Sequence, residues 1–382
     1  MFVCIAGKNN IAVDILEYLI RIEGEFELGV ICNKTETGKN TWQKSLRWFA
    51  QKNNIKEYSL EDVYEIDDLV LLSLEFDRII KTKKFKNARL YNIHFSLLPA
   101  YKGMYTSALP ILNGEKTAGV TFHKIDDGID TGDIIAQKEF SIEGMDCREL
   151  YLSYIRHGTK LVIECMDDVL NNRIKATPQS ALGSTYFSKE TIDYNNLSLD
   201  LNQTAEVIDR QIRAFCFREY QLPKFNGKSI ISARITGIKS NNKPGTILFE
   251  NESCVLLSTI DYNVVLFYDR FDELIVACAA GDVNLVKEIC NVKKHINERN
   301  EKGWTPLIVA TYNNRIEIVK FLISVGADIS VINNNGTNLL MYAKDARMNY
   351  NDNTLFEMYK SLGLLESNRD YYDKDLYYYL GD

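Results

Sequence analysis

The sequence predicts an α/β fold with a largely parallel sheet, followed by a small β-rich domain and a C-terminal set of helical repeats. Three observations support this order. Apolar runs alternate with amphipathic stretches up to about residue 180, short β-prone runs separated by Gly, Pro and Asn follow up to residue 268, and the remaining residues repeat with a period of 33. We therefore expect three domains, at residues 1–180, 181–268 and 269–382.

The first domain alternates strands with helices. We expect strands at residues 2–6, 28–32, 69–74, 90–94, 119–125 and 134–140, and helices at residues 11–22, 42–52 and 148–170. Because a crossover helix connects parallel strands, this alternation predicts a Rossmann-like, largely parallel sheet that is covered on both faces. The pattern leaves the order of the strands open.

The second domain has a different pattern of predicted elements from the first. A helical stretch at residues 205–217 precedes β-prone runs at residues 229–238, 245–249, 255–258 and 264–268. Several short strands separated by turn residues are typical of a small barrel or sandwich, and we expect an OB-like domain.

The third domain contains an internal repeat. Leu274-Ile-Val-Ala277 recurs 33 residues later as Leu307-Ile-Val-Ala310, and Leu340-Met-Tyr-Ala343 follows after the same interval. In the middle copy Thr305-Pro306 stands where a first helix begins, and Gly326-Ala327 where a second one ends. This copy resembles an ankyrin repeat, whose period is about 33 residues. The third copy carries a four-residue insertion around residues 349–353.

Composition and charge restrict the partners. The chain has 45 Lys and Arg against 52 Asp and Glu, a net charge of −7, which argues against a nucleic-acid partner. No apolar run approaches the 18 residues of a membrane span, and the first residues lack the basic start of a signal peptide. The eight cysteines form no CxxC motif, so we expect reduced thiols in a cytoplasmic protein that does not bind a membrane.

The stretch from residue 92 to residue 103 is the most informative one for chemistry. Asn92 and His94 stand at the end of an apolar strand, on the same face and about 7 Å apart. Ligand sites of open α/β sheets gather at such strand ends. A second strand leads into an Asp/Gly-rich loop with Asp126, Asp127 and Asp130, whose spacing does not match a calcium loop. One of these carboxylates could make His94 a general acid/base, although a structural histidine and an acidic turn are the simpler reading of each motif alone.

The two motifs together resemble the folate-dependent formyltransferases. These motifs are Asn92-Ile-His-Phe-Ser-Leu-Leu-Pro99 and Asp126-Asp-Gly-Ile-Asp-Thr-Gly-Asp-Ile-Ile135, and the resemblance covers about residues 1–238. It implies a triad of Asn92, His94 and Asp130 that acts on N10-formyltetrahydrofolate without a metal. In this triad Asn92 would donate to the developing oxyanion, His94 would take the proton of an attacking amine, and Asp130 would orient the imidazole.

The resemblance also implies binding segments for both substrates. The pterin would lie against the loops at residues 76–80 and 125–128, which makes Phe76, Arg78, Ile80 and Asp127 cofactor candidates. The connection from the first of these loops to Asn92 is about two residues shorter than in the purine enzyme of this family. The acceptor substrate would face the residues after the first strand and after the Leu-Leu-Pro turn, namely Lys8, Asn9, Asn10, Tyr101, Lys102 and Tyr105. Core packing and plain surface exposure are the competing explanations.

Three functions compete at this point. A nucleotide-sugar N-formyltransferase fits the acidic charge, and a methionyl-tRNA formyltransferase fits it poorly because tRNA requires a basic face. An ankyrin interaction protein with a degenerate enzyme domain fits the intact triad poorly. The ankyrin segment resembles that of bacterial enzymes that formylate dTDP-3-amino-3,6-dideoxyglucose for the O-antigen of lipopolysaccharide. We expect this activity, with the dTDP-4-amino sugar as the alternative, and we carry over a homodimer from the same branch.

Trp304 directly precedes the Thr305-Pro306 pair, in the turn that projects from an ankyrin stack. A tryptophan in this position is well shaped to stack on a flat base, a contact worth about 1–3 kcal/mol. We therefore predict a second nucleotide site at Trp304, with Asn349, Tyr350 and Asn351 of the inserted segment close to it. Because ankyrin repeats usually bind proteins, a docking or packing role is the alternative.

Overall fold

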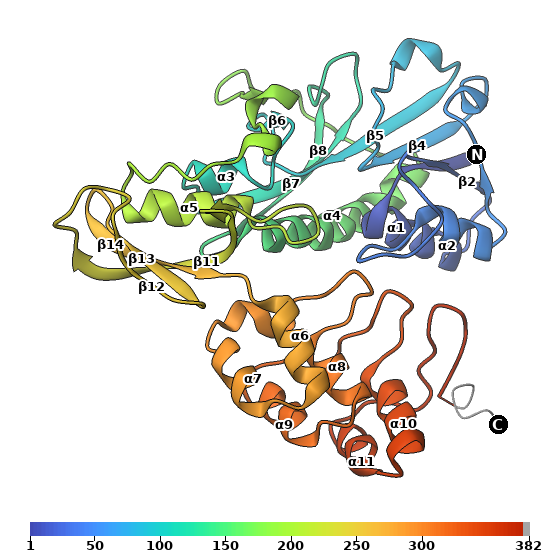
Figure 1. The fold of residues 1–382 in the computed structure, drawn as a ribbon. Coiled ribbons are helices and arrows are strands. Elements are labelled where there is room, and N and C mark those ends of the chain that lie inside the picture. Colours follow the sequence, from blue (N-terminus) through green and yellow to red (C-terminus); the bar gives the residue numbers. More distant parts are fainter. Residues whose placement is uncertain (377–382) are drawn as a thin grey trace. The chain divides into compact units, whose positions relative to one another are not determined.

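The computed structural model describes residues 1–376 of the 382-residue chain (Figure 1). The chain forms two compact units. The first holds residues 1–39, 43–200 and 206–223, and the second holds residues 40–42, 201–205 and 224 onward. The finer division into three domains, with boundaries after residues 180 and 268, stays a prediction.

A seven-stranded sheet forms the centre of the first unit. Its strands, in spatial order, are β3 (Lys56–Glu57), β2 (Glu27–Cys32), β1 (Phe2–Gly7), β4 (Leu69–Leu74), β5 (Ala88–His94), β7 (Thr117–Lys124) and β8 (Ile134–Ser141). The strands from β3 to β5 are parallel, whereas β7 and β8 add antiparallel to the edge. The expected largely parallel sheet is thus confirmed. The chain runs outward from β1 to β3 and returns to β4 on the other side of β1, so a topological switch point lies between β1 and β4.

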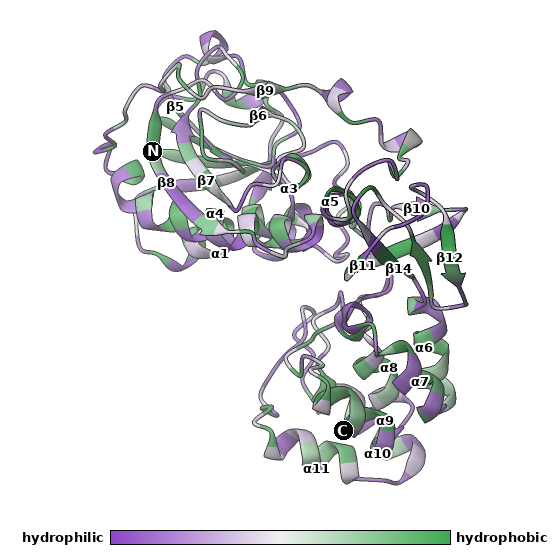
Figure 2. Ribbon diagram, turned by 90° about the vertical axis from the view of Figure 1, so that its left-hand side faces the viewer, coloured by the Kyte–Doolittle hydropathy of each residue, from purple (hydrophilic) through white to green (hydrophobic). Residues whose placement is uncertain are grey.

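Different elements cover the two faces of this sheet. On one face α1 (Asn9–Arg21) and α4 (Cys147–Leu170) lie side by side (Figure 1). In Figure 2 hydrophobic and hydrophilic residues alternate along both helices, as expected for helices that bury one side. A capping box between Asp146 and Glu149 fixes the start of α4. On the other face Leu60 and Val63 pack with strand residues in one apolar cluster. The short α2 (Leu46–Lys52) begins four residues later than the pattern at 42–52 predicts, at the N-cap Ser45.

A second sheet opens the second unit. It has the spatial order β10 (Lys224–Phe225), β11 (Lys228–Lys239), β14 (Tyr262–Tyr268), β13 (Cys254–Leu257) and β12 (Ile247–Glu250), and all pairs are antiparallel. The expected β-rich region is therefore present as a small antiparallel sheet. The sequence pattern favoured a small barrel or sandwich. In the structure β10 and β12 are not paired with each other, so they form the two edges of a single open sheet.

Three helix pairs follow, as expected for ankyrin repeats. They are α6 (Phe271–Ala280) with α7 (Val283–Ile289), α8 (Pro306–Tyr312) with α9 (Ile316–Ser324), and α10 (Leu339–Tyr350) with α11 (Thr354–Ser361). The Thr305 side chain accepts a hydrogen bond from the Ile308 amide at the start of α8, with Pro306 in the first turn. The predicted insertion lengthens α10 to 12 residues, and Asn351 ends this helix with φ +52°. Across residues 1–376, no helix combines the length and apolarity that a membrane span requires.

Candidate active site

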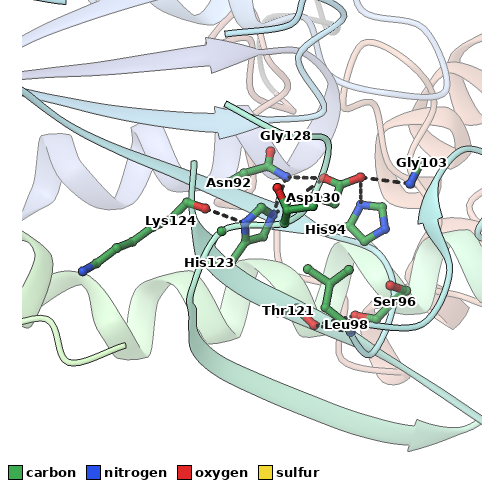
Figure 3. A network of polar contacts seen from close by, with 12 residues as sticks. Asn92, His94, Ser96, Leu98, Gly103, Thr121, His123, Lys124, Gly128 and Asp130 are labelled. Carbon is green, nitrogen blue, oxygen red and sulfur yellow. Dashed lines mark hydrogen bonds and ion pairs between the residues drawn. The ribbon is translucent and has the colours of Figure 1, made fainter. Parts of the chain in front are cut away.

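The structure brings Asn92, His94 and Asp130 together at the carboxyl end of β5 (Figure 3). Asp130 lies between the other two side chains. Its Oδ2 is 3.5 Å from His94 Nδ1, and its Oδ1 is 3.5 Å from Asn92 Nδ2. The alternation along the strand places Asn92 and His94 on one face, as the sequence predicts, and the Asp/Gly loop supplies the carboxylate.

Backbone geometry fixes the position of Asp130. The residue adopts φ +55°, a left-handed conformation that is uncommon outside glycine. The Gly103 amide donates a hydrogen bond of 3.0 Å to its Oδ2. The loop must also pass close to β7, because a Cβ on Gly132 would meet the Lys124 carbonyl oxygen at 1.8 Å. The glycine in the Thr-Gly-Asp sequence after Asp130 therefore has a steric reason.

The hydrogen bonds of His94 define its protonation. Nε2 lies 2.8 Å from the carbonyl oxygen of Tyr101, and because a carbonyl can only accept, this nitrogen carries a proton. Nδ1 is then the nitrogen that can take up a further proton, and it faces the Asp130 carboxylate. Uptake of a proton at Nδ1 would place a positive charge next to a negative one. The geometry of the pair thus suits a general base.

His123 completes the group, and our sequence reasoning did not select it. Its Nδ1 donates to the Lys124 carbonyl at 2.7 Å, so Nε2 is free to accept from Asn92 Nδ2 at 3.0 Å. Burial lowers the pKa of His123, which keeps the ring neutral and able to accept. The signal was the strand register, in which Asn92 pairs directly with His123. One N–H of Asn92 is engaged by His123, and the other makes only the long contact to Asp130.

The two expected cofactor loops also meet. Phe76, Ile80 and Ile125 pack in the same apolar cluster, and the Thr82 hydroxyl donates to Asp127 at 2.6 Å. Beside this contact lies a cavity of about 320 Å³, with Thr82, Phe85, Leu90, Tyr91, Lys124 and Ile125 in its wall. Arg78 forms an ion pair of 2.6 Å with Glu61 on the surface.

The residues after β1 join a network that includes Glu75, which our sequence reasoning missed. Asn9 Nδ2 donates to Glu75 Oε2 at 3.2 Å and to the Tyr151 hydroxyl at 3.1 Å, and that hydroxyl donates to Glu75 at 2.7 Å. Burial raises the pKa of the Glu75 carboxyl above its usual range. The Asn10 side chain accepts from the Lys44 amide at 2.8 Å. Both asparagine amides are thus engaged within the protein, and Lys8 stands beside them at the N-cap of α1.

The loop after the Leu-Leu-Pro turn contributes mainly through its backbone. Tyr101 accepts from His94 with its carbonyl, while its hydroxyl donates to Glu115 at 2.7 Å. Lys102 pairs with Tyr186 in a two-residue ladder. The Tyr105 hydroxyl donates to the Lys189 carbonyl at 2.6 Å. The side chains of both tyrosines are tied to neighbouring segments in this structure.

Trp304 lies in the second unit, partly buried against the core of the repeats. Its ring centroid is 5.4 Å from that of Tyr312 and 5.4 Å from that of Tyr342. The tryptophan is therefore one member of an aromatic group rather than an isolated exposed ring, and Lys302 lies over its face at 5.9 Å.

Within residues 1–376, no three side chains of His, Cys, Asp or Glu gather in a way that could hold a metal ion. Asp126 and Asp127 instead bind their own loop: Asp126 accepts from Thr131 at 2.6 Å, and Asp127 accepts from Thr82. These hydrogen bonds explain the acidic residues of the loop as side chains that stabilise a turn.

Two family models match the chain. A formyl transferase model matches residues 43–163, and an ankyrin-repeat model of three copies matches residues 274–354. Among characterised relatives, methionyl-tRNA formyltransferase of Fervidobacterium nodosum is 28% identical over 311 residues, which span 75% of this chain and 97% of that protein.

Solved structures give a stronger similarity. WlaRD, a sugar 3N-formyl transferase crystallised with dTDP and 5-N-formyl-THF, is 41% identical with a TM-score of 0.65, and the match covers 70% of this chain and 97% of WlaRD. The N-formyltransferase of Helicobacter canadensis, in complex with folinic acid and dTDP-3-aminofucose, is 42% identical with the same TM-score, over 70% of this chain and 99% of that one. At this identity and coverage the chain belongs to the sugar N-formyltransferases, a family of enzymes, and it carries ankyrin repeats in addition.

Proposed function

We propose that the protein transfers a formyl group from N10-formyltetrahydrofolate to the 3-amino group of dTDP-3-amino-3,6-dideoxyglucose. The observation that carries the proposal is the cluster of Asn92, His94 and Asp130, which leaves one amide N–H and one imidazole nitrogen open to ligands. The two relatives above 40% identity support the 3-amino position, because one is a 3N-formyl transferase and the other was crystallised with a dTDP-3-amino sugar. The dTDP-4-amino sugar remains the alternative substrate.

The cluster supports a direct transfer. The amine nitrogen forms a bond to the formyl carbon, and the second N–H of Asn92 binds the oxygen on which negative charge develops. His94 Nδ1 takes the proton that the amine loses, and Asp130 faces the resulting imidazolium. The bond from the formyl carbon to N10 of the folate then breaks, and the same proton passes to N10. His123 holds the Asn92 amide in the required orientation.

The cavity beside Thr82 and Asp127 supports the folate assignment. Its apolar wall of Phe85, Leu90 and Ile125 suits the face of a pterin ring, and it borders the loop that leads to Asp130. We assign Phe76, Ile80 and Asp127 to this site, with Arg78 at the surface end of the first loop. We assign the acceptor sugar nucleotide to Lys8, Asn9 and Asn10, which follow β1 at the switch point of the sheet. We assign to the same substrate Tyr101, Lys102 and Tyr105, which follow the Leu-Leu-Pro turn.

An open edge supports the homodimer. All four residues of the edge strand β12 are exposed, among them Ile247, Leu248 and Phe249 at 44%, 38% and 53% (Figure 2 shows this strand in green). An apolar strand with an unpaired edge is a ready site for pairing with a second copy. The homodimer predicts that Phe249→Lys gives a monomer in light scattering, whereas a wild-type monomer would refute it.

For Trp304 we propose a second nucleotide site on the repeats, supported by the neighbouring rings of Trp304 and the exposed Tyr312, with Tyr342 buried against Trp304. Titration calorimetry with dTDP-sugar should give two sites in the wild type and one in Trp304→Ala. One site in both proteins would return this aromatic group to a packing role. We also place the reaction in O-antigen synthesis in the cytoplasm, where the eight cysteines, which form no disulfide bond within residues 1–376, remain reduced.

The assay that tests the main proposal compares acceptors. The protein is incubated with N10-formyltetrahydrofolate and with dTDP-3-amino-3,6-dideoxyglucose, the dTDP-4-amino sugar or Met-tRNA, and folate absorbance is followed. We expect the 3-amino sugar to react with the highest kcat/KM. Preference for the 4-amino sugar would show that the acceptor is the 4-amino group rather than the 3-amino group. Formylation of Met-tRNA alone would refute the sugar assignment.

A further inference from the structure

One segment of the first unit touches both loops that hold the proposed catalytic pair. This segment, residues 177–189, follows α4 and is called the strap here. It begins with Thr177, which exchanges two backbone hydrogen bonds of 2.8 Å with Ile134 at the start of β8. Near its other end, Tyr186 and Phe187 pair with Lys102 and Gly103 in a two-residue ladder.

The first anchor of the strap is Gln179. Its Nε2 donates to the carbonyl oxygen of Asp130 at 2.8 Å and to that of Gly132 at 2.8 Å. Both acceptors are carbonyls, so the orientation of the amide is fixed: the NH2 group must face the loop. Because Asp130 adopts φ +55°, its carbonyl direction is unusual, and two bonds from one side chain lock this conformation.

The cost of this arrangement is visible on the other amide atom. Gln179 Oε1 is buried, and no group within residues 1–376 donates to it. A buried polar atom without a partner costs about 1–3 kcal/mol. A smaller or apolar replacement would remove this cost, but it would also remove the donors of the Asp130 and Gly132 carbonyls. The structure therefore retains an unfavourable buried carbonyl in exchange for holding the Asp130 loop.

The second anchor is Thr185. Its Oγ1 accepts from the Tyr101 amide at 2.7 Å, and its carbonyl accepts from the Lys102 amide at 3.0 Å. Tyr101 is the residue whose carbonyl binds His94 Nε2, and Gly103 is the residue whose amide binds Asp130 Oδ2. The strap thus fixes the backbone on which the proton of His94 and the orientation of Asp130 both depend.

We propose that the strap positions His94 and Asp130 for proton transfer, with Gln179 and Thr185 as positioning residues that touch neither substrate. The inference rests on the proposed function, because the catalytic role of the pair comes from there. It adds two residues whose effect on the reaction is exerted through the Asp130 and Tyr101 backbone. A displacement of about 1 Å at a reacting group can cost about 100-fold in rate.

The kinetic test uses variants of the full chain. Gln179→Ala removes both donors, Gln179→Glu keeps the shape without them, and Thr185→Val removes the acceptor for Tyr101. Leu182→Ala is the matched control, since Leu182 lies on the strap between the anchors and is 88% exposed. We expect both Gln179 variants to lose about 10–100-fold in kcat with little change in KM. Thr185→Val should lose about tenfold or less, and the control should lose nothing.

A second readout needs no substrate. Amide hydrogen exchange at Gly103 should accelerate in the Gln179 variants, because this N–H depends on the position of the Asp130 carboxylate, while the melting temperature shows that the variants are folded. Unchanged kcat in both Gln179 variants, a loss confined to KM, or unchanged Gly103 exchange would each overturn the inference. If the wild type formylates no dTDP-amino sugar, the proposed function fails, and the Gly103 exchange alone then decides whether the strap positions Asp130.

Discussion

Two polar clusters lie at the carboxyl edge of the seven-stranded sheet, and they contain similar residues. The open cluster, Asn92, His94 and Asp130, follows β5. The closed cluster consists of Asn9 after β1, Glu75 after β4 and Tyr151 in α4. Each has an asparagine amide and a carboxylate. In the closed cluster both oxygens of Glu75 accept from the Tyr151 hydroxyl, at 2.7 and 2.9 Å, and Asn9 adds a third bond.

The open cluster is held by backbone groups instead. Tyr101, Gly103 and Lys124 provide the partners from the main chain, so the side chains keep unused capacity. One N–H of Asn92 and Nδ1 of His94 face Asp130 over 3.5 Å, long enough for a reactant to compete. We therefore expect reactivity at this edge to depend on which atoms lack a short partner rather than on residue type.

The largest effect should come from removing the base. We expect His94→Ala to lower kcat by about 10²–10⁴-fold, the usual contribution of a general base. His157→Gln is the matched control. His157 belongs to α4 and stacks on Phe140 of β8, with 4.4 Å between the ring centroids, and it is not part of the cluster. Steady-state formyl transfer at saturating substrates measures both. Normal turnover in the His94 variant would remove the open cluster from the mechanism.

Asn92→Ala should follow, with a loss of about 10²–10³-fold in kcat, the value typical of one oxyanion donor. The affinity for both substrates should change much less, because the bond to the oxygen strengthens as charge develops. Separate kcat and KM values decide this. A rise in KM with an unchanged kcat would make Asn92 a ground-state contact.

A smaller effect is expected at His123. Replacement by Phe removes the acceptor that orients Asn92, and the loss of one such hydrogen bond corresponds to about tenfold in kcat. His123→Gln can still accept from Asn92 and should recover part of that loss. Equal activity of the two variants would show that the ring contributes bulk rather than a hydrogen bond.

The closed cluster should affect stability rather than rate. The pKa of Glu75 in the folded protein is raised above its ordinary value of 4.5. The protonated Glu75 therefore contributes fully to the free energy of unfolding below pH 4.5, and this contribution is lost as pH rises through the folded-state pKa. Compared with Glu75→Gln, the wild type should lose melting temperature as pH increases above about 4.5. A difference in melting temperature that stays constant with pH would contradict the raised pKa.

The sequence motifs predicted the residues of this edge whose positions depend on the alternation of side chains along a strand. Asn92 and His94 share a face because they stand two positions apart along the strand, and Asp130 came from the family resemblance. His123 required the pairing of β5 with β7, which no local pattern contains. Glu75 was hidden for another reason: φ +57° directly after β4 turns its side chain out of the strand alternation.

Backbone partners and distant segments were also beyond the motifs. Tyr101 was selected for its side chain, whereas its carbonyl binds His94. Gly103 has no side chain and was not selected, and its amide binds Asp130. Gln179 lies 49 residues after Asp130 and carries no motif of its own. Chain topology brings it back to the loop, and only a three-dimensional structure reveals that contact.

The most direct test of the difference between the clusters is a matched pair of carboxylate-to-amide substitutions. Asp130→Asn and Glu75→Gln are compared for kcat with dTDP-3-amino-3,6-dideoxyglucose and N10-formyltetrahydrofolate, in one buffer and at one pH. We predict that Asp130→Asn loses about 10²–10⁴-fold, because the imidazolium loses its counter-charge, while Glu75→Gln stays within about threefold of the wild type. Equal losses in the two variants, or a greater loss in Glu75→Gln, would contradict the account.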